Sequence, residues 1–574
     1  MNKPQVELNQ IMIDFFETID INTYYGCSGG GVLQLLKLIP PYHQEAQGPR
    51  FVYLSEYAAG YAPIGHYLAS GEVACCIATT GAAEKLISSG ASDARYLGVP
   101  ALYLCALASE QNTHRYPIQD IGPQGMQIIE QFRCEFKENV VYIQHDTGIQ
   151  DAMVKIQEGL QQKQPVIVFF HPELLNKKAS AMPYPHQTSK HKIDKEGINK
   201  LIDALLSPQK HHIIVNPCTE VMTSGVNRET FRSFIDKINA QVIYPVNGDN
   251  IAVNTTEQNL GHIMLGGNPS AIHAWNNLSE NDILITLGAD PGEYHLNLAP
   301  YPKCKSFCLT QHTNGYGQMQ GSYKHLFAGK YTQINGNIEV SLQQFMTETQ
   351  TINFPEKNQF ANHHDRAFTN QVIADGKVNI IDFYETMDKL WQPNSLVFED
   401  VCIAYRDRQS IIKQPNKQVK MFTANQGSAM GSAFGLGFGA ALADPNQRVF
   451  VFSGDGCFRL YGGNLMEANQ LNMTLFIMNN SELSIIRDGC NHILKNSPQK
   501  IDHADIRDIH WERLATAFGW RFFRISPDLS NLEHAMITAY DSNPTSTLIE
   551  LPLDGSQVIG KNFRYTNLTN HGNI

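Results

Sequence analysis

Residues 449–456 read VFVFSGDG and residues 475–480 read LFIMNN, and these two stretches decide the fold. Each begins with four apolar residues, as a fully buried strand does, and each ends in glycine or polar residues. Continuous apolar strands separated by helical stretches predict a parallel sheet that is covered on both faces. The loops that follow two such strands leave the same carboxyl edge, where ligands bind in this kind of sheet.

The polar residues of these two loops are suited to a metal ion and a phosphate. Asp455 offers a carboxylate and Asn480 an amide oxygen, and Mg²⁺ prefers such oxygen ligands, completed by substrate phosphates. The glycines let backbone N–H groups approach a phosphate, and the following helix adds the positive end of its dipole. A Gly-Asp-Gly triplet by itself is a simple turn about as often as it is a ligand site. With the Asn pair after the next strand, it predicts a metal–diphosphate site.

The same alternation of strands and helices occurs three times along the chain. Polar stretches at 176–195 and 351–377 contain few apolar residues and are expected to be linkers. We therefore predict an α/β protein of three doubly wound parallel-sheet domains, with boundaries at residues 1–185, 193–350 and 376–574.

Composition excludes several classes of protein. The chain has 574 residues, 55 acidic and 44 basic, and a net charge of −11, so it lacks the basic face of a nucleic-acid-binding protein. Its 11 cysteines form no CxxC pair, which predicts neither a disulfide framework nor a zinc site. No apolar run is long enough to cross a membrane, and the first residues lack the pattern of a signal peptide. We expect a cytoplasmic protein with no membrane partner.

The sequence resembles the thiamine diphosphate (ThDP) enzymes of the acetolactate synthase and pyruvate decarboxylase superfamily. The resemblance covers nearly the whole chain, although the 22 residues between the Gly-Asp-Gly triplet and the Asn pair are a little fewer than the family usually has. Besides those two motifs it rests on the glycine loop at 26–31, Glu56, DARYLGVP at 93–100, LGADPGEY at 287–294 and GSAMG at 427–431.

The resemblance implies a domain order and an assembly. The N-terminal domain would bind the pyrimidine of ThDP, a middle domain would follow, and the C-terminal domain would bind the diphosphate and Mg²⁺. Each cofactor would lie between the N-terminal domain of one subunit and the C-terminal domain of another, in a homodimer or homotetramer. The partners would be a small 2-oxo acid and a carbonyl acceptor. We expect no FAD.

The resemblance also implies the roles of the C-terminal residues. Asp455, Asn480 and the backbone carbonyl of Glu482 would bind Mg²⁺. Gly456 and Cys457 would donate backbone N–H groups to the diphosphate.

Other implied roles concern the pyrimidine. Met430 would wedge under the cofactor, and Ser428 and Met430 would hydrogen-bond the aminopyrimidine through backbone atoms. Gly30 would lie at the cofactor in the glycine loop. Glu56 would be the catalytic acid–base group at the ring nitrogen N1′, with its pKa raised by burial. As isolated residues, Glu56 would be interpreted as a helix-start carboxylate and Met430 as core packing.

Three absences favour one reaction type. Pyruvate decarboxylase-like enzymes have an acid where this chain has Gly30, a glutamate where it has Ile486, and adjacent histidines where it has only His114. Without these acids, and with apolar surroundings at Ile486, protonation of the acyl carbanion should be slow. We therefore predict a lyase or transferase that decarboxylates a 2-oxo acid and transfers the acyl carbanion to a carbonyl acceptor, as acetolactate synthase does.

The substrate residues and the reaction have alternatives. His114, Gln119 and Ile486 are candidates for substrate contacts, and Arg487 could bind a substrate carboxylate or lie on the surface. The stretch 288–294 lacks the arginines of true acetolactate synthases, which favours a neutral acceptor. A simple decarboxylase that releases aldehyde, a ThDP-dependent C–C hydrolase or oxidase, and a catalytically silent paralogue remain open. Glu56 argues against the last.

Overall fold

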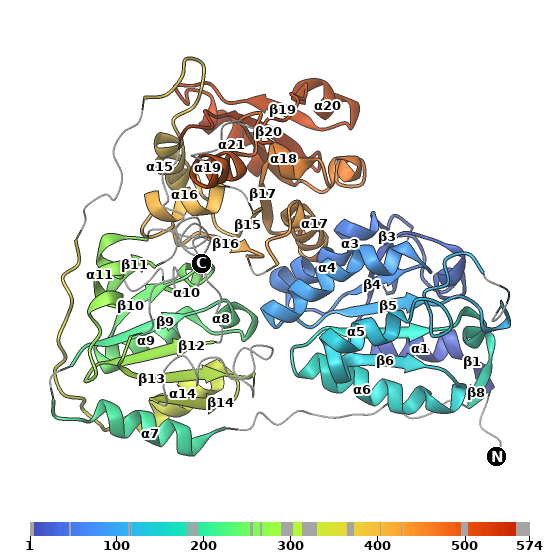
Figure 1. The fold of residues 1–574 in the computed structure, drawn as a ribbon, viewed down its shortest axis with the longest axis horizontal. Coiled ribbons are helices and arrows are strands. Elements are labelled where there is room, and N and C mark those ends of the chain that lie inside the picture. The colour runs from blue at the N-terminus through green and yellow to red at the C-terminus, as the bar shows by residue number, and fades with distance from the viewer. Residues whose placement is uncertain are drawn as a thin grey trace.

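The computed structural model describes residues 5–44, 48–112, 115, 117–180, 184, 193–209, 211–252, 257–263, 267–288, 302–312, 330–363, 372–401, 403–425, 427–494 and 503–557. These residues form three six-stranded sheets, in which every strand pair is parallel, and one small two-stranded sheet (Figure 1). The predicted α/β fold with three doubly wound parallel sheets is confirmed. The three large sheets lie within residues 23–170, 213–335 and 395–552, and the predicted domain boundaries around them remain predictions.

The first large sheet has the strand order β3-β2-β4-β5-β7-β6. Its central strands β4, β5 and β7 are buried along their whole length, because helices cover both faces. Helices α3, α4 and α5 pack on one face, and α1 and α6 on the other. The elements are α1 Leu8–Thr18, β2 Thr23–Gly26, β3 Arg50–Tyr53, α3 Glu56–Ser70, β4 Cys75–Ala78, α4 Ala82–Leu97, β5 Leu102–Ala106, α5 Ile128–Phe136, β6 Val140–Ile143, α6 Ile149–Gln161 and β7 Val166–Phe170.

The polar stretch expected to be a linker begins with a strand. β8 (Lys178–Ser180) pairs antiparallel with β1 (Gln5–Glu7), so the chain stays attached to the N-terminal domain beyond β7. The three residues of β8 are too few, and too polar, to show a strand pattern in the sequence. They form a strand because they pair with β1, which lies more than 170 residues away in the chain.

The middle sheet has the strand order β11-β10-β9-β12-β13-β14, and the direction of winding reverses between β9 and β12. The elements are α7 Lys195–Leu205, β9 Ile213–Pro217, α8 Glu220–Thr223, α9 Arg228–Ile238, β10 Gln241–Tyr244, α10 Asp249–Ala252, β11 Asn259–His262, α11 Pro269–Asn277, β12 Ile283–Leu287, β13 Lys305–Thr310, β14 Tyr331–Asn335 and α14 Ile338–Glu348.

The last sheet has the strand order β16-β15-β17-β18-β20-β19, with the reversal between β15 and β17. The elements are α15 Ile380–Leu390, β15 Ser395–Glu399, α16 Ile403–Ile411, β16 Val419–Thr423, α17 Ser432–Ala443, β17 Arg448–Gly454, α18 Asp455–Phe458, β18 Thr474–Asn479, α19 Ser484–Ile493, α20 Trp511–Ala517, β19 Arg521–Arg524, α21 Leu532–Tyr540 and β20 Thr547–Pro552.

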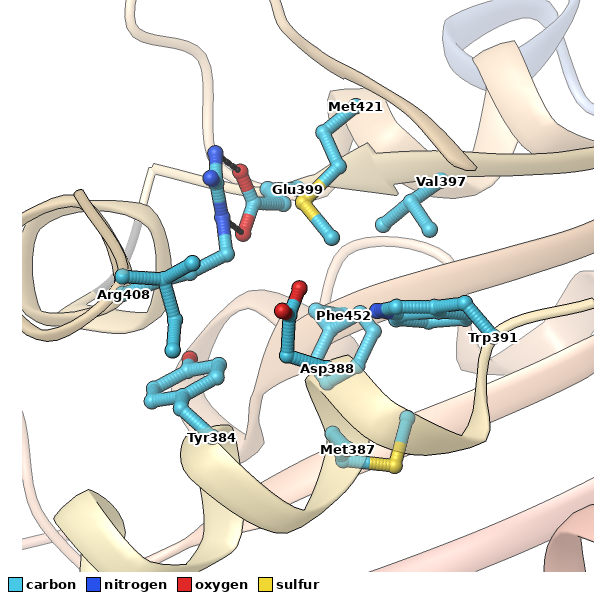
Figure 2. A pocket seen from close by; sticks show the side chains of 10 residues that line it. Tyr384, Met387, Asp388, Trp391, Val397, Glu399, Arg408, Met421 and Phe452 are labelled. Atoms are coloured by element: carbon cyan, nitrogen blue, oxygen red, sulfur yellow. Dashed lines mark hydrogen bonds and ion pairs between the residues drawn. The ribbon is translucent and has the colours of Figure 1, made fainter. Parts of the chain in front are cut away.

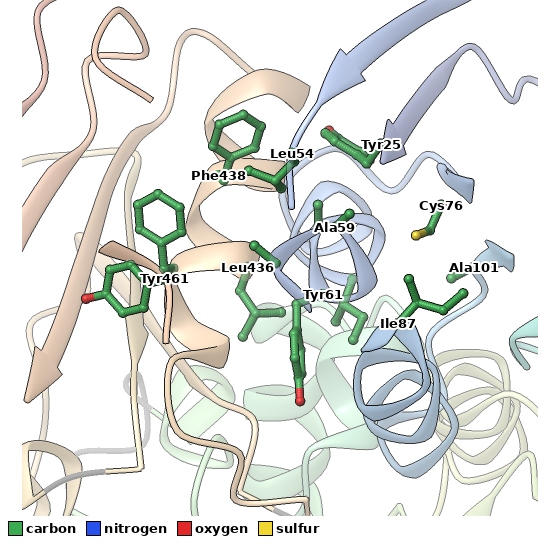
Figure 3. Close-up of a cluster of buried hydrophobic side chains, with 14 of the residues drawn as sticks. Tyr25, Leu54, Ala59, Tyr61, Cys76, Ile87, Ala101, Leu436, Phe438 and Tyr461 are labelled. Atoms are coloured by element: carbon green, nitrogen blue, oxygen red, sulfur yellow. The ribbon is translucent and has the colours of Figure 1, made fainter. Parts of the chain in front are cut away.

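Helices α3 and α17 join the N-terminal and C-terminal domains. They cross at backbone contact, because a Cβ atom on Gly65 would lie 1.8 Å from the Leu436 carbonyl oxygen, and one on Gly439 would lie 1.9 Å from that of Ala62. The apolar cluster around them is continuous from one domain into the other (Figure 3). The start of α3 is thereby fixed beside the start of the C-terminal domain's α17.

The middle and C-terminal domains meet around a buried arginine. Figure 2 shows Arg408 of α16 facing Glu399, to which its Nε and Nη2 atoms each donate a hydrogen bond of 2.8 Å. Its Nη1 atom lies 3.3 Å from Oδ2 of Asp249 in the middle domain. Because all three side chains are buried, each charge depends on the others, and the two domains are held at this point.

Among the described helices, none is both long enough and apolar enough to cross a membrane.

Candidate active site

Asp455 connects the two loops that the sequence placed at one sheet edge. β17 and β18 are neighbours, with Gly454 opposite Met478, and Asp455 begins α18 directly after β17. Oδ1 of Asp455 accepts a hydrogen bond from the Gly456 N–H (2.9 Å), and Oδ2 accepts one from the Ser481 N–H (2.7 Å). The carboxylate therefore lies between the Gly-Asp-Gly loop and the Asn-Asn loop, as predicted.

The electrostatics of Asp455 favour a cation. The residue is only 4% exposed, and burial raises the pKa of its carboxyl to about 6. A bound cation would offset this cost, because its positive charge favours the ionised carboxylate.

The other predicted metal ligands lie in the same loop. Asn480 accepts a hydrogen bond from the Glu482 N–H through Oδ1 (3.2 Å), and its Nδ2 donates to Ser484 Oγ (2.6 Å). Glu482 and Asp505 form an antiparallel β-bridge, whose two hydrogen bonds are accepted by the carbonyls of Ser481 and Ala504. The Glu482 carbonyl takes no part in this bridge. In the described part of the chain no three His, Cys, Asp or Glu side chains form a metal cluster, whereas the predicted ligand set needs only one carboxylate. This donor set fits Mg²⁺.

Arg487 is held by two carboxylates. Its Nε donates to Glu482 Oε2, and its Nη2 donates to Asp505 Oδ1. Glu482 also accepts from Ser484 Oγ at 2.7 Å, so its side chain is used within the protein and its predicted contribution is the backbone carbonyl. A substrate carboxylate would have to compete with both acids for Arg487, and its role in substrate binding stays a prediction.

The GSAMG loop lies beside the Gly-Asp-Gly loop. A Cβ atom on Gly456 would be 3.7 Å from the methyl carbon of Met430 and 2.4 Å from Leu483 Cδ2, so a larger residue there would require the Leu483 side chain to move. Cys457, in the first turn of α18, is buried. The structure thus brings Met430, Gly456 and Cys457 together, which is the arrangement that a cofactor wedge next to a diphosphate site requires.

Glu56 is the first residue of α3, between two residues that contact the C-terminal domain. The preceding Ser55 exchanges two hydrogen bonds with Asn464 of the C-terminal domain: its N–H donates to Oδ1 (2.9 Å), and its Oγ accepts from Nδ2 (2.8 Å). The following Tyr57 donates its hydroxyl hydrogen to the Met430 carbonyl (2.5 Å). Glu56 is half-buried rather than buried as expected, and its carboxylate has no hydrogen bond or ion pair with another described residue.

Gly30 is the open position of the glycine loop. A Cβ atom on Gly29 would meet Thr79 Oγ1 at 2.5 Å, and one on Gly31 would meet Thr80 Oγ1 at 2.7 Å. A Cβ atom on Gly30 would meet nothing within 4 Å. A side chain would therefore fit at residue 30, and the absence of an acid there is a matter of chemistry and not of space.

The remaining substrate candidates are less well placed. Gln119 is exposed, with φ 62°, and packs against Gly81. Ile486 is 46% exposed, so the water-excluding surroundings expected for it are wrong for the single chain; it projects from α19 with few neighbours to cover it. His114 and residues 289–294 lie outside the described residues.

Sequence reasoning missed four residues that hold the site. They come from four separate segments, and only Asp93 belonged to a motif that the sequence singled out. For Tyr57, the only feature of the sequence that could have indicated a role in the site was its place directly after Glu56. The four are Tyr57, Asp93, Asp400 and Asn464.

Comparison with known families supports the same site. Residues 6–128 match the thiamine pyrophosphate enzyme N-terminal TPP binding domain, and residues 409–551 match the corresponding C-terminal TPP binding domain. No curated protein matches the chain significantly. The first match contains Glu56, and the second contains the GSAMG, Gly-Asp-Gly and Asn-Asn motifs. The chain belongs to the thiamine diphosphate-dependent enzymes of the acetolactate synthase and pyruvate decarboxylase superfamily.

Proposed function

We propose that this enzyme decarboxylates a 2-oxo acid and transfers the remaining acyl unit to a carbonyl acceptor, with Mg²⁺ as the metal. The observation that carries the proposal is the open, acid-free position at Gly30 in the glycine loop. A carboxyl group would fit there, yet the chain places none. Without an acid at this position a bound acyl unit is protonated slowly, and an acceptor then has time to react.

The residues of the site divide into holding and proton-transfer groups. Asp455, Asn480 and the Glu482 carbonyl would hold Mg²⁺, and the backbone at Gly456 would face the diphosphate. The bound cofactor supplies a nucleophilic carbon and an electron sink for decarboxylation. Glu56 would share a proton with the pyrimidine nitrogen, because its carboxylate is half-buried and unused by other described residues.

The product ratio tests this proposal. The protein would be incubated with ThDP, Mg²⁺ and a panel of 2-oxo acids, with and without aldehydes, and the products analysed by mass spectrometry. With donor and saturating acceptor, most of the carbon should leave as ligated product. If the wild type releases mainly aldehyde, the enzyme is a simple decarboxylase.

A matched pair of variants sharpens the test. Ile486→Glu places a carboxyl where decarboxylases carry one and should shift the ratio toward free aldehyde. Ile493→Glu is the control, because Ile493 lies two turns further along α19 and is similarly exposed, at 53% against 46%. A shift of equal size in both variants would mean that charge on this helix matters and the position of the acid does not.

One contact favours aldehyde release as the second candidate. The Cys27 thiol, in the glycine loop, lies 3.6 Å from the Tyr53 hydroxyl oxygen and donates to it. The Tyr53 phenol is protonated near neutral pH even at its ordinary pKa of 10.0, which this contact raises further, and it could act as a proton donor. Under this candidate Tyr53→Phe lowers aldehyde release; under the carboligase proposal it leaves the product ratio unchanged.

We also propose a homodimer or homotetramer with sites between subunits. In the single chain Tyr57 and Met430 join its own N- and C-terminal domains, and sites between subunits would require the same contact to form between two chains instead. Co-expression of the inactive variants Glu56→Gln and Asp455→Ala tests this. Shared sites should restore about one quarter of wild-type activity, since one site in each mixed dimer is intact. Sites within single chains would restore none.

A further inference from the structure

The peptide that joins Met430 to Gly431 has both of its polar atoms held by side chains of different domains. Its carbonyl oxygen accepts the hydrogen bond from Tyr57 of the N-terminal domain (2.5 Å). Its N–H donates to Oδ1 of Asp400 (2.8 Å), directly after β15 in the C-terminal domain. Asp400 is completely buried and also accepts from Ser453 Oγ (2.6 Å), one residue before the Gly-Asp-Gly triplet.

The other end of the loop is held from the N-terminal domain as well. The Gly427 N–H donates to Oδ1 of Asp93 on α4 (2.9 Å), and Asp93 is 1% exposed. A Cβ atom on Gly427 would lie 2.1 Å from that oxygen, so the contact depends on glycine. Asp93 and Tyr57 therefore grip the backbone of the loop on either side of Ser428.

The loop conformation needs such support. Ser428 has φ 48° and Gly431 has φ 83°, so two of its five residues are in the left-handed region. This conformation costs energy for serine, which has a Cβ atom, and it persists only where the surroundings fix it. The Ser428 hydroxyl also donates to the carbonyl of Asn425, two residues before the loop (2.7 Å), and this local hydrogen bond stabilises the turn.

We propose that Tyr57 and Asp93 are positioning residues that fix the loop 427–431, and with it the Met430 wedge, relative to Glu56. Tyr57 follows Glu56 in the first turn of α3, and α17 begins directly after the loop. The close packing of α3 on α17 keeps the start of α3, with Glu56 and Tyr57, at a fixed distance from the loop 427–431. The inference rests on the cofactor site of the proposed function and is independent of which product the enzyme releases.

The contact also determines which backbone groups the loop offers. Burial raises the pKa of Tyr57 to about 12, so its phenol stays protonated and donates at neutral pH. The Met430 carbonyl is thereby engaged. Within the described residues, the Met430 N–H and the Ser428 carbonyl have no hydrogen-bond partner and remain for an aminopyrimidine.

A matched pair of tyrosine variants tests Tyr57. Tyr57→Phe removes one hydroxyl, and the control Tyr67→Phe removes another from the same helix, where it contacts the Thr223 carbonyl of the middle domain (3.4 Å). Three quantities would be measured: the Tm without cofactor, ThDP affinity by fluorescence titration with Mg²⁺, and the rate of hydrogen–deuterium exchange at cofactor C2 under saturation. Loss of one hydrogen bond predicts about tenfold weaker ThDP binding in Tyr57→Phe, with slower exchange.

The control decides between positioning and general stability. Tyr67→Phe should lower the Tm without cofactor but leave affinity and exchange unchanged. Unchanged affinity and exchange in Tyr57→Phe would overturn the proposal for Tyr57. Equal losses in both variants would also overturn it, because they would show only looser domains. Failure of the cofactor site itself is distinguishable, since wild-type protein would then not bind ThDP at all.

A conservative rescue tests Asp93. Asp93→Asn keeps an oxygen that can accept from the Gly427 N–H, whereas Asp93→Ala removes it. The Asn variant should keep ThDP affinity within a factor of about three, and the Ala variant should lose about tenfold. If both variants bind ThDP like the wild type, or the Asn variant loses as much as the Ala variant, the hydrogen bond does not position the loop.

Discussion

The middle and C-terminal sheets have equivalent edges that are used differently. Both are six-stranded parallel sheets with a reversal of winding at the centre, which opens a crevice at the carboxyl ends of the strands. In the middle sheet Glu220, two residues beyond the Cys218 that follows β9, is 3% exposed and accepts hydrogen bonds from Thr310 Oγ1 (2.7 Å) and the Gln311 N–H (2.8 Å). In the C-terminal sheet the hydrogen bonds that Asp455 accepts from other described residues come from the backbone N–H groups of Gly456 and Ser481.

The difference shows that topology locates a crevice and side chains decide its use. The Glu220 side chain packs against Gly288, where a Cβ atom would meet it at 2.6 Å, so it fills its edge of the sheet. Asp455 instead has a pKa raised by burial, and the loops beside it carry oxygen donors and glycines. We infer that one edge is used for structure and the other for a ligand.

The largest expected effect is at Asp455. ThDP with Mg²⁺ should raise the Tm of the wild type, because a ligand that binds only the folded state stabilises it. Asp455→Ala should abolish most of this rise by removing the one carboxylate of the metal site. Differential scanning fluorimetry with and without cofactor measures it, and a full response in the variant would remove the metal assignment.

Glu56→Gln separates holding the cofactor from activating it. The C-terminal edge should still bind ThDP, so the cofactor-induced rise in Tm should remain. Exchange at cofactor C2 should slow by roughly 10²-fold or more, the usual worth of a positioned acid–base group. NMR of the quenched cofactor gives the rate. A wild-type rate would show that another group performs this step.

Glu220→Gln tests the structural use of the middle edge. The variant keeps the shape of the side chain but weakens two buried hydrogen bonds, so the free energy of unfolding should fall by about 1–3 kcal/mol. The cofactor-induced rise in Tm should be unchanged. Denaturant unfolding with and without ThDP checks both quantities, and loss of the cofactor response would break the contrast between the two edges.

The smallest effect is a pH dependence at Asp93. Burial raises the pKa of this carboxyl from its ordinary 3.8 to about 7, so the folded state binds its proton more tightly than the unfolded state. The associated stability is complete below pH 3.8 and is lost as the pH rises through about 7. Asp93→Asn cannot titrate. The stability of the wild type relative to this variant should therefore fall across that interval, as measured by denaturant unfolding at several pH values. A constant difference would contradict the assignment.

The sequence by itself determined the three parallel sheets and the meeting of the Gly-Asp-Gly and Asn-Asn loops at one sheet edge. Buried strands between helices must be apolar along their whole length, and that pattern is visible in residues 449–452 and 475–478 without knowledge of any distant contact. The position of Asp455 beside the Asn-Asn loop followed from the same rule, because neighbouring parallel strands end at one edge.

Only the tertiary structure decided how the site is held. Tyr57 contacts Met430 across 373 residues of sequence, and Asp93 contacts Gly427 across 334. The exposure of Ile486 and the pairing of Arg487 with two acids were equally invisible. The spacing of apolar residues along a helix or strand shows which of its faces is buried. It does not show which distant backbone group a side chain on that face contacts. These contacts depend on α3 crossing α17 at backbone distance, and that crossing exists only once the domains are packed.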